Sequence, residues 1–262
     1  EAVKVRVRRS GGFANIASGV LASYVTLIAG DDPAQQVEVT RRFLTASLMS
    51  APAALMISKI MLPETSTPAT LGAVRVAVPH ETRNSIHAVT IGAADGARLA
   101  FNVSAMLLTF IALLALIDAL LSWMGTLSGV AWVAPALGLP KLSLGGLLGL
   151  VFAPVAWLIG ADWAECRTFG SLIGLSMAGN EFLAYVRLKE LISAGQISER
   201  TVLLATYSLC GFANFSSIAI QIGGIGAMAP DRRSDLARLG LRAMLGGAMS
   251  TWMTGTIAGI LS

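Results

Sequence analysis

Residues 210–219 read CGFANFSSIA and lie in the middle of a long apolar run, Val202–Met228. The same four letters, GFAN, return near the start of the chain, where residues 11–20 read GGFANIASGV. Gly and Asn belong to turns and caps rather than to hydrophobic helix interiors. Backbone without helical pairing is tolerated at membrane depth only where protein or a watery cavity covers it. Both stretches therefore indicate helices that are broken inside a hydrophobic environment.

The composition around these stretches is that of a membrane protein. The 262 residues are 55% hydrophobic and only 13% charged, with a net charge of +4, whereas a soluble domain carries about 25% charged residues. The basic residues lie in connections and not in a patch with interleaved aromatic residues, which argues against nucleic-acid binding. The two cysteines, Cys166 and Cys210, lie far apart and indicate neither a disulfide framework nor a metal site. The composition predicts an all-α integral membrane protein.

A membrane-spanning helix needs about 20 mostly apolar residues. The candidate runs are Gly11–Ala29, Phe43–Leu62, Leu99–Met124, Leu142–Gly160, Ser171–Leu188, Val202–Met228 and Leu239–Leu261. Arg200 and Arg232 flank Val202–Met228, so with both flanks in the cytoplasm this run would enter and return as a re-entrant hairpin. Leu142–Gly160 contains a proline and several glycines, and it is interpreted as either a crossing or an interfacial helix.

Glu181, in GNEFLAYVRL, is the most informative ionisable residue. It lies within the run Ser171–Leu188, where a carboxylate is costly unless it is paired or hydrated. One interpretation is a glutamate near a helix end that reaches the interface. The other is a hydrogen-bond acceptor for a polar solute, or a group that couples transport to protons. Broken helices with polar tips indicate a transporter's binding site near the bilayer midplane, which favours the second.

The polar tip of the expected hairpin holds Asn214, Ser216 and Ser217, with Phe212 beside them. These polar residues could cap two half-helices or contact a ligand, and the two roles are compatible. Phe212 could pack in the core or stack on a planar ring. Asn15, in the first GFAN stretch, could bond a neighbouring helix or mark a broken helix whose carbonyls hold a cation.

An intramembrane enzyme using Ser217 and Glu181 is the alternative from another functional class. No His and Asp accompany a serine within the membrane runs, so no catalytic residue is assigned. His80 and His87 lie in a polar segment and are expected to be solvated. Asp118 would be either a second intramembrane acid or a residue at a helix end. No cofactor and no metal site are expected beyond a coupling ion.

Several stretches together resemble the concentrative nucleoside transporter family. They are GNEFLAY, CGFANFSSIAIQIGGIGAMAPDRRSDLARLGLRA, GGFANIASGVLASYV, SLMSAPAALMISKIMLPET and ARLAFNVSAMLLTFIALLALI. They occur in family order and cover nearly all of the chain from Gly11 onward, and the NEF and GFANxSS motifs are specific. The chain departs from the family by having Ser176 and Met177 in the region before NEF where a lysine is common.

The resemblance implies a polytopic helical transporter with broken helices and a re-entrant hairpin, part of an inverted-repeat fold that assembles as a homotrimer. It implies that Glu181, Asn214 and Ser217 bind the ribose hydroxyls of a nucleoside and that Phe212 sits against the base. The broken helix carrying Asn15 and Ile16 would supply part of a sodium site. The family's first hairpin precedes the matched region, so we expect the chain to be a C-terminal portion that keeps the ribose half of the site.

The predicted function is secondary active transport of nucleosides, coupled to a cation gradient, with sodium as the coupling ion. The alternatives are coupling to protons through an acid such as Glu181, and an incomplete fragment without transport activity of its own. The expected location is the plasma membrane, the inner membrane in a bacterium, with the lipid bilayer as a partner.

The runs and the resemblance also predict how the chain is organised. The expected parts are a truncated or disordered N-terminus (1–10), a broken helix and the following helix of a transport domain (11–62), a polar loop and interfacial helix (63–97), a scaffold helix and interfacial region (98–170), and a transport-domain helix, the re-entrant hairpin and a final helix (171–262).

Overall fold

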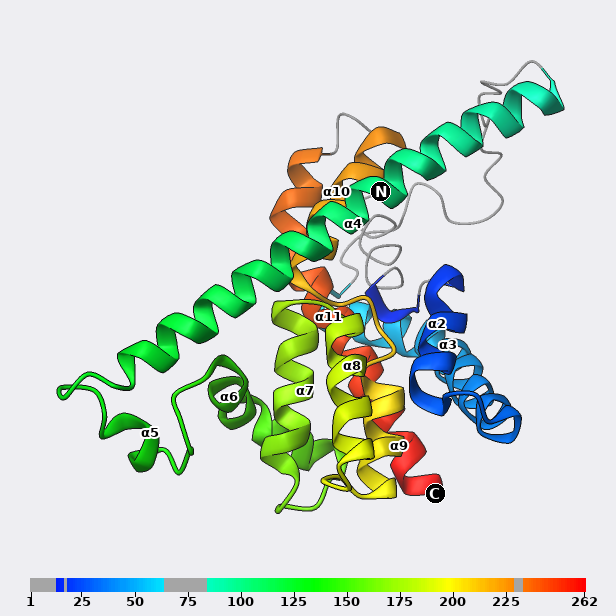
Figure 1. The fold of residues 1–262 in the computed structure, drawn as a ribbon. Helices are drawn as coiled ribbons and strands as arrows, with labels where there is room; N and C mark the ends of the chain where they lie inside the picture. The colour runs from blue at the N-terminus through cyan, green and yellow to red at the C-terminus, as the bar shows by residue number, and fades with distance from the viewer. Residues whose placement is uncertain (1–12, 17, 64–83, 229–232) are drawn as a thin grey trace.

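The computed structural model describes residues 13–16, 18–63, 84–228 and 233–262. All regular secondary structure in these ranges is helical (Figure 1), which confirms the predicted all-α fold. The helices are α2 (Ser18–Ala29), α3 (Pro33–Met61), α4 (Ser85–Met124), α5 (Val133–Ala136), α6 (Leu144–Ile159), α7 (Cys166–Ala178), α8 (Glu181–Ser193), α9 (Glu199–Ser208), α10 (Phe215–Met228) and α11 (Arg233–Leu261). The predicted N-terminal part and most of the predicted polar loop lie outside the described residues.

The first broken helix is present as predicted. Phe13 and Ala14 are helical, Asn15 and Ile16 are not, and α2 begins at Ser18. The GFAN sequence thus interrupts the helix at its asparagine, and the chain is helical again from Ser18.

Helix α3 begins earlier than the apolar run predicts. The Asp32 side chain accepts a hydrogen bond from the Ala34 backbone N–H, and Pro33 occupies the first turn. Both are strong helix-start signals, so the polar stretch that was interpreted as a connection is the first part of α3. Among the described helices, α3 is the one that is both long and apolar enough to cross a membrane.

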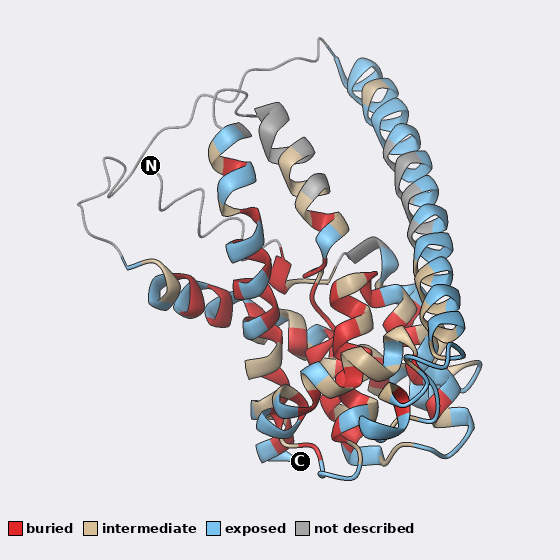
Figure 2. Cartoon of the chain, turned by 90° about the vertical axis from the view of Figure 1, so that its left-hand side faces the viewer, coloured by how far each residue is buried: buried red, intermediate tan, exposed pale blue. Residues whose placement is uncertain are grey.

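Helix α4 is a single helix of 40 residues. It begins after Asn84, whose side chain accepts from the His87 backbone N–H. The predicted boundary between an interfacial helix and a scaffold helix at residues 97 and 98 therefore does not interrupt the helix. Figure 2 shows that α4 stands beside the other helices and is exposed along most of its length.

The run Ser171–Leu188 is not one crossing but parts of two helices, α7 and α8. Each has 13 residues and is therefore about 20 Å long, which is shorter than the roughly 30 Å hydrocarbon core of a bilayer. They lie side by side (Figure 1), joined by a turn at Gly179 and Asn180. The Asn180 side chain accepts from the Leu183 backbone N–H and so caps α8. The structure thus has its helical hairpin here.

The prediction of a hairpin within Val202–Met228 is wrong. Helices α9 and α10 follow one another along α11, and each packs against a different part of that helix (Figure 1). The non-helical segment 209–214 joins them. Because both halves bury side chains on the same long helix, the segment continues in one direction instead of turning back.

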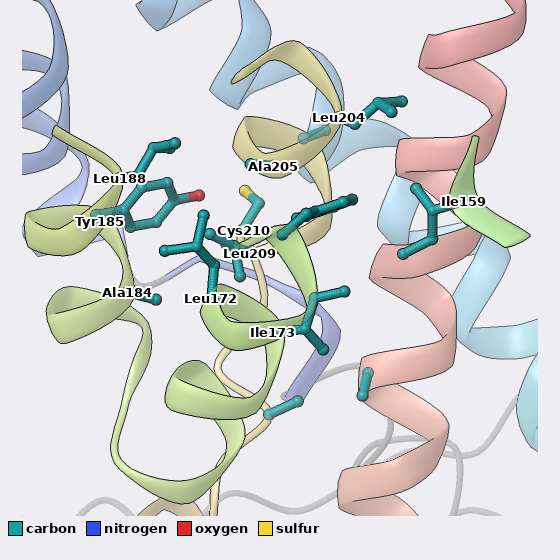
Figure 3. Packing of buried hydrophobic residues seen from close by; sticks show 14 of the residues in the cluster. Ile159, Leu172, Ile173, Ala184, Tyr185, Leu188, Leu204, Ala205, Leu209 and Cys210 are labelled. Carbon is teal, nitrogen blue, oxygen red and sulfur yellow. The ribbon is translucent and has the colours of Figure 1, made fainter. Parts of the chain in front are cut away.

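The core lies between the hairpin α7–α8 and the helices α6, α9 and α11. Leu172, Tyr185, Leu188, Leu204 and Cys210 are buried within it, as Figure 3 shows. Inside a membrane such side chains hold helices together through close van der Waals packing, because lipid tails are as apolar as the side chains themselves. This core holds the tip of the hairpin and the segment 209–214 at fixed positions.

Helix α6 of 16 residues is the element whose role the sequence left open. It is about 24 Å long, and it packs closely along α7. A Cβ atom on Gly170 would lie 2.8 Å from the backbone oxygen of Gly149, so glycine at this position allows the two helices to approach. Helix α6 is therefore a short helix fixed on the hairpin.

Candidate functional site

Three interruptions of helical structure meet in the centre of the molecule. They are residues 15–16, the hairpin tip at 179–180, and segment 209–214. A Cβ atom on Gly211 would lie 2.9 Å from the Phe13 carbonyl oxygen, and one on Gly247 would lie 2.4 Å from Phe13 Cβ. The first interruption thus packs directly on the third, and these contacts require glycine.

Glu181 and Asn214, both predicted site residues, are in direct contact. Asn214 Nδ2 donates a hydrogen bond of 3.0 Å to Glu181 Oε2, and the two residues are 5% and 0% exposed. Glu181 is the first residue of α8, and Asn214 directly precedes α10. Helix N-termini carry partial positive charge, which favours a carboxylate there. The site therefore consists of two helix starts joined by a carboxylate–amide pair.

Asn214 also caps α10. Its side-chain oxygen accepts from the Ser217 backbone N–H at 2.8 Å and from the Ser216 hydroxyl at 2.7 Å. The Ser217 hydroxyl oxygen accepts from the Asn214 backbone N–H at 3.1 Å, and it lies 2.6 Å from the Phe212 carbonyl oxygen, to which it donates. This reciprocal pattern is that of a capping box. The capping role and the contact with Glu181 thus use opposite ends of one amide.

Tyr24 completes this group, and the sequence reasoning missed it. Its hydroxyl donates a hydrogen bond of 3.1 Å to Glu181 Oε1, and the residue is buried. Both carboxylate oxygens of Glu181 therefore have a donor from another element, Tyr24 from α2 and Asn214 from the start of α10. A tyrosine in an apolar run gives no signal by itself, because the partner lies 157 positions away in the chain.

An aromatic cluster supports Tyr24. Its ring centroid lies 4.9 Å from that of Tyr185 and 6.2 Å from that of Phe43, and Phe43 meets Tyr185 edge-to-face at 5.5 Å. The Tyr185 hydroxyl donates to the Thr206 carbonyl oxygen at 3.0 Å. The cluster joins α2, α3 and α8 and fixes the ring whose hydroxyl contacts Glu181.

Asn15 lies at the first interruption and bonds a neighbouring helix. Its side-chain oxygen accepts from Ser47 at 2.6 Å and from Ser50 at 3.0 Å, both on α3. Ile16 is half-buried and packs against the core. The side-chain oxygen of Asn15 is therefore used in holding the interruption on α3.

Asp118 has a structural role. Its carboxylate accepts from the Leu144 backbone N–H at 2.8 Å, and the Ser143 hydroxyl accepts from the Gly146 backbone N–H at 3.2 Å. Together they cap the start of α6. Of the two histidines, His87 lies in the exposed first turn of α4, and His80 lies outside the described residues.

The chemistry of the central group is that of hydrogen-bond recognition. A carboxylate, an amide and hydroxyl groups converge in a region shielded from water, where buried polar groups discriminate strongly between partners that satisfy them and partners that do not. Among the residues that the structure describes, no group of three His, Cys, Asp or Glu side chains could hold a metal ion.

Comparison with known proteins identifies one group of relatives. The sequence model of a family described as "Na+ dependent nucleoside transporter C-terminus" matches residues 42–259. An uncharacterized transporter of Haemophilus influenzae is 41% identical over 254 residues, which cover 95% of this chain and 56% of that protein. Sodium/nucleoside cotransporter 1 of Mus musculus is 35% identical over 272 residues, which cover 98% of this chain and 39% of that protein.

A solved structure also matches. The structure of CNTnw in an inward-facing substrate-bound state has a TM-score of 0.78 and 36% sequence identity, covering 99% of this chain and 57% of that one. The chain thus spans 39% to 57% of the length of the relatives described here.

Proposed function

The chain belongs to the family of Na+-dependent nucleoside transporters, the concentrative nucleoside transporters, and we propose that the protein carrying it moves nucleosides across a membrane together with sodium ions. The observation that carries the proposal is the buried hydrogen bond between Glu181 and Asn214 at the meeting point of α8 and α10. A carboxylate that accepts and an amide that donates and accepts suit the vicinal hydroxyls of a ribose.

In this proposal Glu181 and Asn214 bind the ribose, and Ser217 holds Asn214 in place and adds a hydroxyl. Phe212, which is half-buried beside them, provides a face for the base. Without substrate, Glu181 and Asn214 satisfy each other's hydrogen-bonding groups. A nucleoside would therefore replace the hydrogen bond between them with hydrogen bonds to its ribose. Selectivity then follows from the groups that are left unpaired when a hydroxyl is missing.

Sodium coupling is proposed at the first interruption, where Asn15 and Ile16 leave helical pairing. Carbonyl oxygens released by a broken helix can replace the water around a sodium ion. Since Phe13 packs on Gly211 and Gly247, an ion that orders this interruption also orders segment 209–214. A homotrimer in the plasma membrane, the inner membrane in a bacterium, completes the proposal.

Equilibrium binding of uridine to the purified full-length protein tests it. We expect sodium-dependent binding that is absent in choline, and weaker binding of 2′- and 3′-deoxyuridine. Glu181→Gln should reduce uridine affinity at least about tenfold and narrow the gap between uridine and its deoxy analogues, because a charge-assisted hydrogen bond contributes about 1.5–3 kcal/mol.

Asn214→Ser is the matched variant, because serine keeps the capping ability of asparagine and is too short to reach Glu181. It should bind uridine weakly and fold with only a modest loss of thermal stability, because the cap of α10 is kept while Glu181 Oε2 loses its donor. Equal affinity for uridine and its deoxy analogues in the wild type would contradict the ribose assignment. Binding that ignores sodium but follows a pH change would establish the proton alternative, and absence of binding to residues 1–262 alone would establish the fragment alternative.

A further inference from the structure

A small cavity lies between α7, segment 209–213 and α11, and its lining ends at Ala213, the residue before Asn214. Its volume is about 10 Å³, which is room for about one water molecule or an ion of similar size. Its polar lining comes from Ser176 on α7, Ser208 at the end of α9, Gly211, and Thr251 on α11. The cavity thus touches the hairpin, the broken helix and the long helix that supports both.

Ser208 is the residue that points to a ligand. It is 3% exposed, and in the described part of the chain its hydroxyl is the buried side-chain atom without a hydrogen-bond partner. A Cβ atom on Gly255 would lie 2.0 Å from Ser208 Oγ, so glycine at 255 leaves the room that this oxygen occupies. Burying an unpartnered hydroxyl is costly. The fold therefore makes room for an oxygen that no described protein group uses.

The ends of two helices decide whether the cavity favours a positive or a negative ion. Ser208 is the last residue of α9, and Ser176 lies in the last turn of α7. A helix C-terminus carries partial negative charge and carbonyl oxygens without intrahelical partners. Two such ends at one cavity favour a cation.

The lining also limits the charge of that cation. No carboxylate of the described residues lines the cavity, so the charge of a divalent ion would be poorly compensated there. Hydroxyl and carbonyl oxygens suit a small monovalent ion. Thr251 Oγ1 donates to the Ala248 carbonyl oxygen at 2.9 Å, which leaves its own lone pairs free to act as ligands.

We propose that this cavity binds a sodium ion, held by the hydroxyls of Ser176, Ser208 and Thr251 and by carbonyl oxygens at the ends of α7 and α9. The site is separate from the one proposed at Asn15 and Ile16. Its occupant would add a connection between the hairpin and the broken helix to the hydrogen bonds that Glu181 and Tyr185 already make there.

The position of the ion gives it a role in substrate binding. The α7 wall of the cavity leads within a few residues to Glu181, and the wall formed by 209–213 leads directly to Asn214. An ion that joins these walls holds the pair at its spacing. By thermodynamic reciprocity, a nucleoside bound to the pair raises the sodium affinity of the cavity by the same factor. This role rests on the proposed function, whereas the ion site itself does not.

Thermal unfolding of the purified full-length protein, without nucleoside, tests the site. The protein is titrated with sodium chloride, with choline chloride keeping the ionic strength constant, and with potassium chloride in parallel. We expect sodium to raise the melting temperature of the wild type. Ser208→Ala removes no hydrogen bond to another described residue, so it should fold normally. It should need about tenfold more sodium for the same effect, which equals about 1.4 kcal/mol of binding free energy.

Thr251→Val is the second variant, which keeps the shape of the side chain and removes a ligand oxygen. Ser250→Ala is the matched control. Ser250 is fully buried on the same helix, donates to the Gly246 carbonyl oxygen at 2.6 Å and does not line the cavity. It should respond to sodium as the wild type does.

A wild-type sodium response in Ser208→Ala and Thr251→Val would overturn the proposal and leave a water molecule in the cavity. A response that disappears in Asn15→Ala but persists in both cavity variants would place the stabilising ion at the other site, and would overturn it as well. Uridine binding is measured in the same samples. Failure of uridine to bind the wild type would refute the proposed function, while the sodium titration would still decide the cavity.

Discussion

Tyr24 contributes to the central site through a hydrogen bond that only the structure reveals. Its hydroxyl provides a hydrogen bond to a carboxylate that is 5% exposed, and such bonds to charged groups contribute about 1.5–3 kcal/mol. Tyr24→Phe keeps the ring in the aromatic cluster and removes this donor. We expect uridine affinity to fall about tenfold, with a small loss of thermal stability, because Glu181 is held from one side only.

Tyr185→Phe is the control for that variant, since its hydroxyl bonds the Thr206 carbonyl oxygen and not Glu181. It should lower the melting temperature and leave uridine affinity within about twofold of the wild type. A Tyr24→Phe protein that binds uridine normally would show that Asn214 alone orients the carboxylate.

Much of the central site could be predicted at the scale of single residues. Glu181 and Asn214 stand out because polar groups in apolar runs are costly and need a reason. Tyr24 could not be found in that way, because a tyrosine is ordinary in a membrane helix. Only the contact across 157 positions shows its role.

At the scale of elements, the contact between α6 and α7 depends on glycine. A Cβ atom on Gly170 would lie 2.8 Å from backbone atoms of Ala153 and Gly149, and rigid backbone cannot move aside as a flexible side chain can. Gly170→Ala should therefore separate the helices and cost about 1–3 kcal/mol of stability, as overpacking does. The measurement is the melting temperature of the purified protein.

Gly145, on α6, is a glycine where an added methyl group has free space, unlike Gly170. Nothing lies within 4 Å of a Cβ atom placed there, and alanine favours a helix over glycine by about 0.5–1 kcal/mol. Gly145→Ala should raise the melting temperature slightly. Equal effects from the two substitutions would mean that helix propensity, and not the close approach, controls this pair.

Glu165 joins two connections outside the helices. Its carboxylate accepts from the Ser198 backbone N–H and from the Ser198 hydroxyl, each at 2.8 Å. Burial acts to raise the pKa of Glu165, but hydrogen bonds from Thr201 and Ser198 together outweigh it, so the pKa lies below its usual value of 4.5. The folded state therefore binds this proton less readily than the unfolded chain does.

The sign of the pH effect follows from that shift. A lowered pKa contributes stability that is fully present above the usual value and is lost as the pH falls through the lowered one. Thermal stability should thus decline below about pH 4.5, and Glu165→Gln should flatten this decline while lowering stability at neutral pH. Melting temperatures measured between pH 3 and 7 test this prediction. If the melting temperature of Glu165→Gln falls with acid as steeply as that of the wild type, Glu165 is not responsible for the decline.

The direction of the chain at each interruption was the part of the fold that the sequence predicted poorly. Gly179–Asn180 and residues 209–214 are both polar breaks within apolar runs, and their compositions look alike. In the structure the first turns the chain back and the second lets it continue along α11. Packing against α11, a helix that comes later in the chain, decides between the two outcomes. The local composition at each break gives no information about that contact.

At the scale of the whole molecule, Phe13 connects the beginning of the chain with its end. Gly247→Ala would place a Cβ atom 2.4 Å from Phe13 Cβ and push the first interruption away from α11. Because the proposed sodium site at Asn15 and Ile16 adjoins this contact, we expect sodium to enhance uridine affinity several-fold less than in the wild type.

Gly259→Ala is the control for this variant, on the same helix. A Cβ atom there would meet the flexible end of Leu204, 2.4 Å away, far along the chain from the Phe13 contact. It should change stability little, because the end of Leu204 can shift, and it should leave the sodium enhancement intact. The same loss of enhancement in both variants would mean that general destabilisation of α11 is responsible.

The length of α4 has a geometric consequence. A helix of 40 residues is about 60 Å long, roughly twice the hydrocarbon thickness of a bilayer. It is too long to stand upright wholly within the hydrocarbon core, so it must tilt or extend beyond that core. Its first part carries Asp95 and Arg98, whereas its apolar part is Ile111–Met124. The two parts of α4 therefore suit different surroundings: Ile111–Met124 suits lipid, whereas the part with Asp95 and Arg98 suits the headgroup region or water.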